Sequence, residues 1–263
     1  GFSTKQASIE FYHSPYIEYV ISIFMFVSGI NFTLLLLFVN GKFRKFIHDA
    51  ELKWYLWSVI GFTAFIAIVL YYNSSMGVEE AFRKSLFQVA SLHTSTGFAT
   101  ADYMTWPSVL WGTLTVIMII GACAGSTTGG MKCIRLLILA KISRNEFKHI
   151  THPNAVLPVR VNKQVISPSI RSTVLAFSFL YAVLIIVGTL AMMGMGVGLL
   201  ESLGCTISSL GNMGPGLGLC GPAYSWNELP DMGKWLMSFF MLLGRLELFT
   251  VLLLFSSDFW KKN

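Results

Sequence analysis

The stretch His93-Thr94-Ser95-Thr96-Gly97-Phe98-Ala99-Thr100-Ala101-Asp102-Tyr103 decides the fold, because it is polar yet lies between two long apolar runs. A soluble protein places such a stretch in a surface turn. Between membrane spans, non-helical backbone is tolerated only where it is buried in protein or lines a water-filled cavity. The stretch therefore predicts a re-entrant segment. A selectivity filter, in which carbonyl oxygens replace the water around an ion, is the best-known case.

The composition is that of an integral membrane protein. Of the 263 residues, 54% are hydrophobic and 12% are charged, whereas soluble domains carry about 25% charged residues. A bilayer is spanned by about 20 apolar residues. Five segments meet this length, and they cover residues 19–39, 54–78, 103–131, 172–200 and 235–257. Glycines interrupt the second half of the third segment, and the fifth is apolar apart from Arg245 and Glu247.

The charges predict how these spans are oriented. Basic residues concentrate in residues 40–53, in residues 132–171 and in the C-terminal tail, while the segments between them are mostly acidic. By the positive-inside rule the basic segments are cytoplasmic. We therefore interpret the net charge of +6 as a signal of topology, and we expect no nucleic-acid partner.

Two further segments are too short to span a membrane. Residues 79–90 and 199–209 have helix-like patterns, and each is followed by a polar stretch that contains glycine. A short helix and a glycine-containing return indicate a re-entrant pore loop. The acidic character of the nearby connections predicts that both loops enter from the outer side, where they attract cations.

The pore loops belong to an internal repeat. Three prolines are each followed fourteen residues later by a glycine, and these pairs are Pro15 with Gly29, Pro107 with Gly121, and Pro230 with Gly244. The first residues, Gly1-Phe2-Ser3-Thr4, match Gly97-Phe98-Ala99-Thr100. The chain is thus predicted to begin within a filter and to be the C-terminal part of a longer protein. We divide it into the end of one repeat (1–53), a complete repeat with a cytoplasmic connection (54–168) and another complete repeat (169–263).

Four motifs together resemble the Trk/Ktr/HKT superfamily of potassium transporters, and most closely its bacterial TrkH-type subunits. They are Thr94-Ser95-Thr96-Gly97-Phe98-Ala99-Thr100-Ala101-Asp102-Tyr103, Gly121-Ala122-Cys123-Ala124-Gly125-Ser126-Thr127-Thr128-Gly129-Gly130-Met131-Lys132, Asn212-Met213-Gly214-Pro215-Gly216 and Gly244-Arg245-Leu246-Glu247-Leu248-Phe249-Thr250. The resemblance covers essentially the whole chain.

The resemblance implies an all-α membrane protein with potassium-channel-like repeats of helix, pore loop and helix around a pseudo-fourfold axis, of which this chain holds the second repeat's end, the third and the fourth. It implies channel-like potassium uptake in the bacterial inner membrane, with K⁺ as the transported ion and no cofactor. It also implies a homodimer within the lipid bilayer and a cytosolic ring of nucleotide-binding regulators of the RCK/KTN type. The amphipathic stretch at 132–148 and the polar loop after it predict a docking face for such a regulator.

Aligning the repeats on their glycines predicts the filter. The ion-binding residues are expected to be Gly1, Thr94, Ser95, Thr96, Gly97, Phe98, Gly211, Asn212, Met213 and Gly214. Their carbonyls are expected to coordinate the ion, with side chains such as Met213 packed behind. In the family, a glycine at this point of each repeat goes with potassium. The alternative for this stretch is an ordinary extracellular loop.

A glycine-rich segment and one arginine predict control of the pore. The expected gating residues are Gly121, Gly125, Ser126, Thr127, Thr128, Gly129, Gly130, Lys132 and Arg245. Small residues interrupt a span at membrane depth, and in the family this is an intramembrane loop that obstructs conduction. A charge inside the membrane is a functional hypothesis by default. The alternatives are a patch of close helix packing, a structural salt bridge of Arg245, and an interfacial role for Lys132.

Other functions remain open at this stage. An ion-coupled symporter of K⁺ or Na⁺ also uses interrupted helices. We expect no enzyme, because no nucleophile with a base and no set of metal ligands is found, and the glycine-rich segment lacks the lysine of a phosphate loop. The four cysteines, Cys123, Cys133, Cys205 and Cys220, form no C-x-x-C pair. Their mostly apolar or glycine-rich surroundings favour buried small hydrophobes over a disulfide or a metal site.

Overall fold

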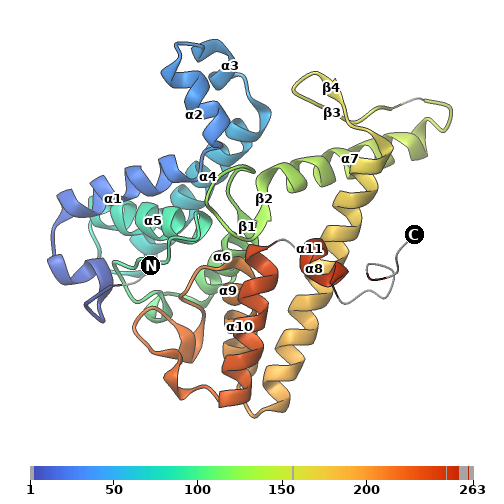
Figure 1. The fold of residues 1–263 in the computed structure, drawn as a ribbon. Coiled ribbons are helices and arrows are strands. Elements are labelled where there is room, and N and C mark those ends of the chain that lie inside the picture. The colour runs from blue at the N-terminus through green and yellow to red at the C-terminus, as the bar shows by residue number, and fades with distance from the viewer. Residues whose placement is uncertain (1–2, 156, 247, 255–259, 261–263) are drawn as a thin grey trace.

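The computed structural model describes residues 3–155, 157–246, 248–254 and 260, and it is mostly helical (Figure 1). The helices are α1 (Pro15–Ser28), α2 (Phe32–Val39), α3 (Phe43–Ile47), α4 (Ala50–Asn73), α5 (Val78–His93), α6 (Ser108–Ile119), α7 (Cys133–Thr151), α8 (Pro168–Gly194), α9 (Leu199–Gly211), α10 (Asp231–Arg245) and α11 (Leu248–Leu253). Short 3₁₀ turns are η1 (Ser8–Tyr12), η2 (Tyr103–Thr105), η3 (Gly218–Cys220) and η4 (Trp226–Glu228). The strands are β1 (Ile120–Gly121), β2 (Met131–Lys132), β3 (Arg160–Val161) and β4 (Gln164–Val165).

Among the described residues, two helices are long and apolar enough to cross a membrane, α4 and α8. Of the five predicted spans, residues 19–39 and the described part of 235–257 are not continuous helices, whereas the interruption in the second half of 103–131 was predicted from its glycines. Residues 19–39 lie in α1 and α2 with a bend of 103° between them, and the pair counts as a third span only if it is taken as one broken helix. Residues 103–131 reduce to α6, and the described part of 235–257 is divided between α10 and α11.

The breaks have local causes. Asn31 accepts a hydrogen bond from the amide of Thr33 (2.8 Å) and so caps a new helix directly after α1. The third predicted span ends its helix at Ile119, where the chain enters the parallel bridge between β1 and β2. Hydrophobicity alone does not reveal such caps and bridges, because they depend on backbone partners.

The two short helices that were predicted as pore helices are both present. α5 packs against α4 and α6, and α9 packs in the same way against α8 and α10. Each also packs against the preceding repeat, since α1 lies on α5 and α6 lies on α9. This duplicated arrangement is what an internal repeat requires. The division of the chain at residues 53 and 168 stays a prediction.

The prolines and glycines of the repeat mark the two ends of equivalent helices. Pro15 is the first residue of α1, while Pro107 and Pro230 directly precede α6 and α10. Proline suits a helix start because the first amides have no partner within the helix. Gly29 follows the last residue of α1, Gly121 lies two residues past α6, and Gly244 is in the last turn of α10.

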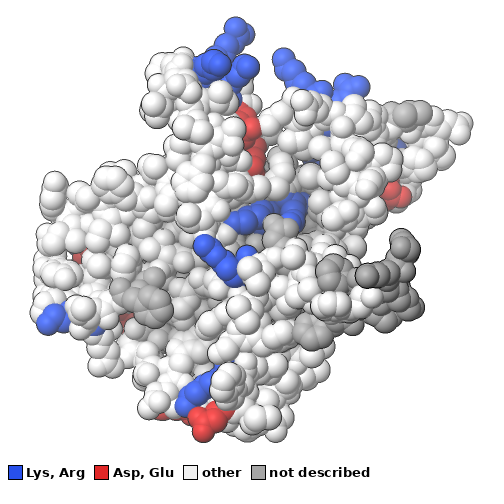
Figure 2. Space-filling model, in the orientation of Figure 1, with Lys and Arg blue, Asp and Glu red and all other residues white. Residues whose placement is uncertain are grey.

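The basic residues gather on the segments predicted to be cytoplasmic. Figure 2 shows Lys and Arg side chains over α2 and α3 and over the α7 region. In the connection between α7 and α8, β3 and β4 form an antiparallel hairpin in which Arg160 pairs with Val165. Val161 of this hairpin is buried against Leu137, Ile138 and Val174. The connection is therefore a packed element and not a loose loop.

A buried ion pair joins neighbouring repeats. Arg83 of α5 bonds Glu18 of α1 at 2.6 Å, and the two side chains are only 11% and 7% exposed. Arg83 also bonds Glu79 at 2.8 Å, four residues before it on the same helix. A charged pair that is withdrawn from water depends on its partner, because a lone buried charge is poorly solvated. Glu18 thus fixes α1 against the pore helix of the next repeat.

We expect Glu18→Gln to lower the stability of the full-length protein by about 2 kcal/mol, since a hydrogen bond to a charged group is lost. The measurement is the thermal unfolding midpoint in detergent. Asp231→Asn is the matched control, because Asp231 is 93% exposed in its pair with Lys234 and an exposed pair contributes little. Equal midpoints for wild type and Glu18→Gln would contradict the role given to this pair.

Candidate functional site

The two segments that follow the pore helices share one backbone conformation. We call residues 94–98 and 211–215 the return segments. Ser95 and Asn212, each two residues before the return-segment glycine, have φ of 54° and 53°. The glycines, Gly97 and Gly214, have φ of 77° and 101°. Left-handed backbone is rare outside glycine, so its recurrence at both matched positions supports the predicted alignment of the repeats.

Matching hydrogen bonds accompany these angles. The amide of Ser95 donates to the carbonyl of Leu92 (3.2 Å), and that of Asn212 donates to Ser209 (3.1 Å). One residue later, Thr96 donates to Ser91 (2.9 Å) and Met213 donates to Ser208 (3.0 Å). The same turn therefore closes the C-terminal end of each pore helix.

The return segments touch each other backbone to backbone. A Cβ atom built on Gly97 would lie 2.0 Å from the carbonyl oxygen of Met213. Only a residue without a side chain fits this contact and this positive φ. The Met213 side chain is buried in the apolar cluster around α6, as predicted, and Phe98 packs beside Phe87. Gly1, the predicted equivalent in the partial repeat, lies outside the described residues.

Hydroxyl groups hold the first return segment in shape. The Thr94 hydroxyl donates to the Ala90 carbonyl (2.7 Å) and bonds the hydroxyl of Thr96 (2.7 Å). Ser91 donates to the carbonyl of Phe98 (2.6 Å). Side chains of the pore helix thus satisfy polar groups that the turn leaves without helical partners.

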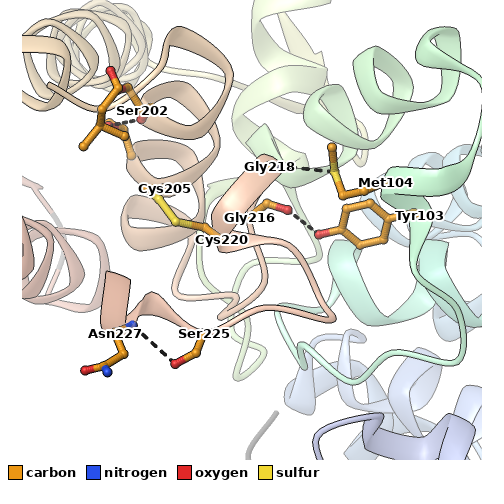
Figure 3. Close-up of a disulfide and its surroundings, with 11 residues drawn as sticks. Tyr103, Met104, Ser202, Cys205, Gly216, Gly218, Cys220, Ser225 and Asn227 are labelled. Atoms are coloured by element: carbon orange, nitrogen blue, oxygen red, sulfur yellow. Dashed lines mark hydrogen bonds between the residues drawn. A yellow bond between two sulfur atoms is a disulfide. The ribbon is translucent and has the colours of Figure 1, made fainter. Parts of the chain in front are cut away.

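The two segments beyond the return segments are also linked. The buried hydroxyl of Tyr103 donates to the Gly216 carbonyl (2.5 Å), and the amide of Gly218 donates to the sulfur of Met104 (3.4 Å) (Figure 3). Tyr103 stood in the stretch that decided the fold but was given no role. Its partner lies in the other repeat, so no pattern within one pore loop could reveal it.

A disulfide joins Cys205 and Cys220, and this corrects the prediction that the cysteines are only buried hydrophobes. Their Cα atoms are 6.2 Å apart, and the bond ties the middle of α9 to the 3₁₀ turn after the second return segment (Figure 3). A re-entrant loop brings its two arms together, so the 15-residue separation is easily closed. Both cysteines belong to a loop predicted to enter from the outer, oxidising side, which is the signal that was missed. Cys123 and Cys133 are free and buried.

The glycine-rich segment forms a closed loop between α6 and α7. Its ends run parallel, with Ile120 paired to Met131 and Gly121 paired to Lys132. The loop contacts both return segments. The amide of Gly129 donates to the Ser95 hydroxyl (3.1 Å), and a Cβ atom on Gly129 would lie 2.0 Å from the Gly211 carbonyl oxygen. The 121–132 loop therefore lies across the ends of the two pore helices.

Basic side chains hold the 121–132 loop from two sides. Arg245, at the end of α10, donates to the carbonyl of Thr127 (2.8 Å). Lys132 bonds the carbonyl of Thr128 and its hydroxyl, the latter at 3.0 Å. The structure thus brings together the residues predicted to control the pore. Glu247, the other charged residue of the last predicted span, lies outside the described residues.

Cavities lie at both ends of this arrangement. One, of about 420 Å³, is lined by Gly97 and Gly214 of the return segments, together with residues near the N-terminus and η4. The other, of about 230 Å³, is lined mainly by the 121–132 loop and by basic side chains. Its lining residues are Gly125, Ser126, Thr127, Thr128, Gly129, Gly130, Lys132, Arg135, Phe177, Gly244 and Arg245. Figure 2 shows basic side chains in a hollow at the centre of the molecule. The return segments and the 121–132 loop separate the two spaces.

One contact of the loop was not anticipated. The carboxylate of Glu51, at the start of α4, accepts hydrogen bonds from the amides of Ala124 (2.6 Å) and Ile134 (3.2 Å). The sequence placed Glu51 among the cytoplasmic acidic residues. A signal for it was its position at the start of an apolar span, where a carboxylate is buried only with partners.

Paired re-entrant loops of this kind, set among membrane-spanning helices, define a membrane transport protein of the pore-loop class. The family model described as "TrkH: Cation transport protein" matches residues 1–262, and the chain belongs to this family. The fold predicted from the sequence is confirmed, as is its location as a multi-pass protein of the bacterial inner membrane.

The relatives extend beyond this chain. It is 35% identical over 265 residues to the Trk system potassium uptake protein TrkH of Halomonas elongata, covering 100% of this chain and 54% of that protein. The same protein of Escherichia coli K12 is 35% identical over 268 residues, with the same shares. The crystal structure of the potassium transporter TrkH from Vibrio parahaemolyticus matches with a TM-score of 0.93 at 33% identity, covering 99% of this chain and 56% of that one. The chain spans about half the length of the curated relatives it matches.

We expect Tyr103→Phe to destabilise the full-length protein by about 2 kcal/mol, because it leaves the buried Gly216 carbonyl without its hydroxyl donor. Tyr181→Phe is the control, since the buried Tyr181 hydroxyl has no hydrogen-bond partner among the described residues. The midpoints of thermal unfolding should fall for the first variant and stay level or rise for the second. A similar response of both variants would show that the Tyr103 bond contributes nothing specific.

Proposed function

We propose that this chain forms part of a channel-like potassium uptake pore, in which carbonyls of the two return segments bind the ion. The observation that carries the proposal is the meeting of two matched left-handed turns, Ser95–Gly97 and Asn212–Gly214, between two cavities. Backbone that turns back in this way presents carbonyls to a water-filled space, which is how a filter replaces an ion's hydration shell. The relatives named above are potassium uptake proteins, which supports K⁺ as the ion.

The 121–132 loop is the proposed gate. It lies against the return segments through Gly129 and is held by Arg245, so an ion that leaves the filter meets the loop and its basic surroundings. A fixed positive charge at this place also raises the electrostatic barrier to a cation. Movement of the loop and of Arg245 together would open the inner cavity.

The predicted partners remain part of the proposal. A homodimer and a cytosolic ring of nucleotide-binding regulators were expected from the family resemblance. The segment between α7 and α8 offers a surface for such a regulator, because Phe147 and Ile150 near the end of α7 are 73% and 70% exposed among basic residues. Exposed apolar side chains on a charged segment are typical of a binding surface.

We expect the full-length protein in planar bilayers to carry a current that reverses at the K⁺ Nernst potential, whatever the Na⁺ and proton gradients. A reversal potential that shifts with either of these gradients would instead indicate the ion-coupled symporter.

In the same assay Gly97→Ala should abolish K⁺ selectivity, because its Cβ collides with the Met213 carbonyl oxygen. Gly112→Ala is the control, since a Cβ at Gly112 meets nothing within 4 Å. Retained selectivity in a folded Gly97→Ala protein would exclude this filter.

We expect Arg245→Ala to raise K⁺ flux about tenfold, because the loop loses a charge-assisted hydrogen bond at Thr127 and the pore loses a positive charge. Flux into proteoliposomes of the full-length protein measures this. Arg245→Lys keeps the charge but loses the geometry of the guanidinium, so its flux separates the tether from the electrostatic barrier. Unchanged or lower flux in a normally folded Arg245→Ala protein would argue against a gating role.

A further inference from the structure

The first residues of α4 contact two distant parts of the chain, the β3–β4 hairpin and the 121–132 loop. In Figure 1 the tip of the hairpin points toward the region where α3 meets α4, and the β1–β2 bridge lies closer to the centre of the molecule. Residues 49–51 are consecutive, so a displacement of Asp49 is transmitted directly to Glu51. The contacts on each side are specific.

On the hairpin side, the side-chain amide of Asn162 forms two hydrogen bonds with the start of α4, one through its oxygen and one through its nitrogen. Its carbonyl oxygen accepts from the amide of Ala50 (2.8 Å), and its nitrogen donates to the Asp49 carboxylate (2.6 Å). Asn162 and Lys163 have φ of 49° and 68°, the geometry of a tight two-residue hairpin turn. The Ala50 amide is among those a helix leaves without a partner at its N-terminus. The hairpin thus completes the cap of α4.

On the loop side, a single carboxylate oxygen holds both arms of the 121–132 loop. Glu51 accepts from Ala124, just inside the loop, and from Ile134, in the first turn of α7. Glu51 is 6% exposed. A buried carboxylate with two amide donors is firmly oriented, because each lost donor leaves charge without compensation. Glu51 therefore adds a second connection at the base of the loop, beside the β1–β2 bridge.

We propose that residues 49–51 couple the β3–β4 hairpin to the 121–132 loop, so that a cytosolic regulator bound at the hairpin changes the loop through Asn162 and Glu51. The inference rests on the proposed gate for its functional meaning, while the mechanical coupling is independent of which ion is carried. A regulator that withdraws Asn162 loosens the N-terminus of α4, and the donors of Glu51 lose their acceptor. A regulator that displaces the β3–β4 hairpin away from α4 thus favours the open state of the 121–132 loop.

The test is amide hydrogen exchange of the full-length protein in lipid nanodiscs, followed by mass spectrometry of peptides that cover residues 121–134. Glu51→Gln removes the charge that holds the loop. Asn162→Gly removes the side chain but allows the positive φ of the turn. Asp49→Ser keeps a good helix cap but loses the bond to Asn162. Asn145→Ala is the control, because the Asn145 side chain of α7 bonds the Leu157 carbonyl (3.0 Å) in the same connection and not the start of α4.

We expect exchange in this peptide to become about fivefold faster in Glu51→Gln, Asn162→Gly and Asp49→Ser, and to stay unchanged in Asn145→Ala. The double variant Glu51→Gln/Asn162→Gly should exchange no faster than Glu51→Gln alone, since both act through one connection. Unchanged exchange in Asn162→Gly overturns the coupling. So does an equal acceleration in Asn145→Ala, which would place the connection in α7 instead.

The hydrogen-exchange measurement tests the coupling, and the transport measurement tests the proposed function, so the two can fail independently. A protein that carries no K⁺ but shows the expected exchange pattern would refute the proposed function and keep the coupling. A protein that carries K⁺ selectively and shows no response of the loop to Asn162→Gly would refute the coupling alone.

Discussion

Backbone that leaves a helix at membrane depth must find its hydrogen-bond partners inside the protein, and this requirement governs the centre of the molecule. The return segments meet it by repeating one turn at the end of α5 and α9, in which left-handed residues direct amides back to the pore helix. The hydroxyls of Ser91 and Thr94 satisfy carbonyls that the turn exposes. The 121–132 loop meets it differently, by a parallel bridge at its base and by partners on α4, α7 and α10. The same demand is thus met once by a repeated turn and once by a loop whose partners come from other helices.

The repeats explain what the sequence could predict. Proline at helix starts, glycine at helix ends and a polar return after a short helix are local signals, and they located α5, α9, Gly97 and Gly214 correctly. The contacts between repeats carry no such signal. Glu18 with Arg83 and Tyr103 with Gly216 join residues of different repeats that come together only after the chain has folded. The role of Glu51 could not be predicted for the same reason, because its partners lie on the far side of α6 in the sequence.

The extent of the membrane-spanning helices was the weakest part of the prediction, because it was based on apolar composition. Apolar composition over residues 19–39 states that the segment is surrounded by lipid or protein, but it does not state that the helix is straight. The bend of 103° after α1 is made by a side-chain cap at Asn31, which hydropathy counts only as one polar residue. A Cβ on Gly125 of the 121–132 loop would lie 3.0 Å from the Asn31 side chain, so the bend also makes room for the loop. Interrupted helices and the loop are therefore one structural solution.

The contacts of the two re-entrant loops with each other and with the 121–132 loop restrict how the protein can be altered. Gly97 packs against the Met213 carbonyl, Tyr103 donates a hydrogen bond to the Gly216 carbonyl, and Ser95 accepts one from the amide of Gly129. A chimaera that exchanges one pore loop for that of a relative must therefore preserve three matched surfaces in the rest of the chain. A substitution in one pore loop is compatible with the fold only if the contacts with the other loop are kept, so the two loops have to be altered together.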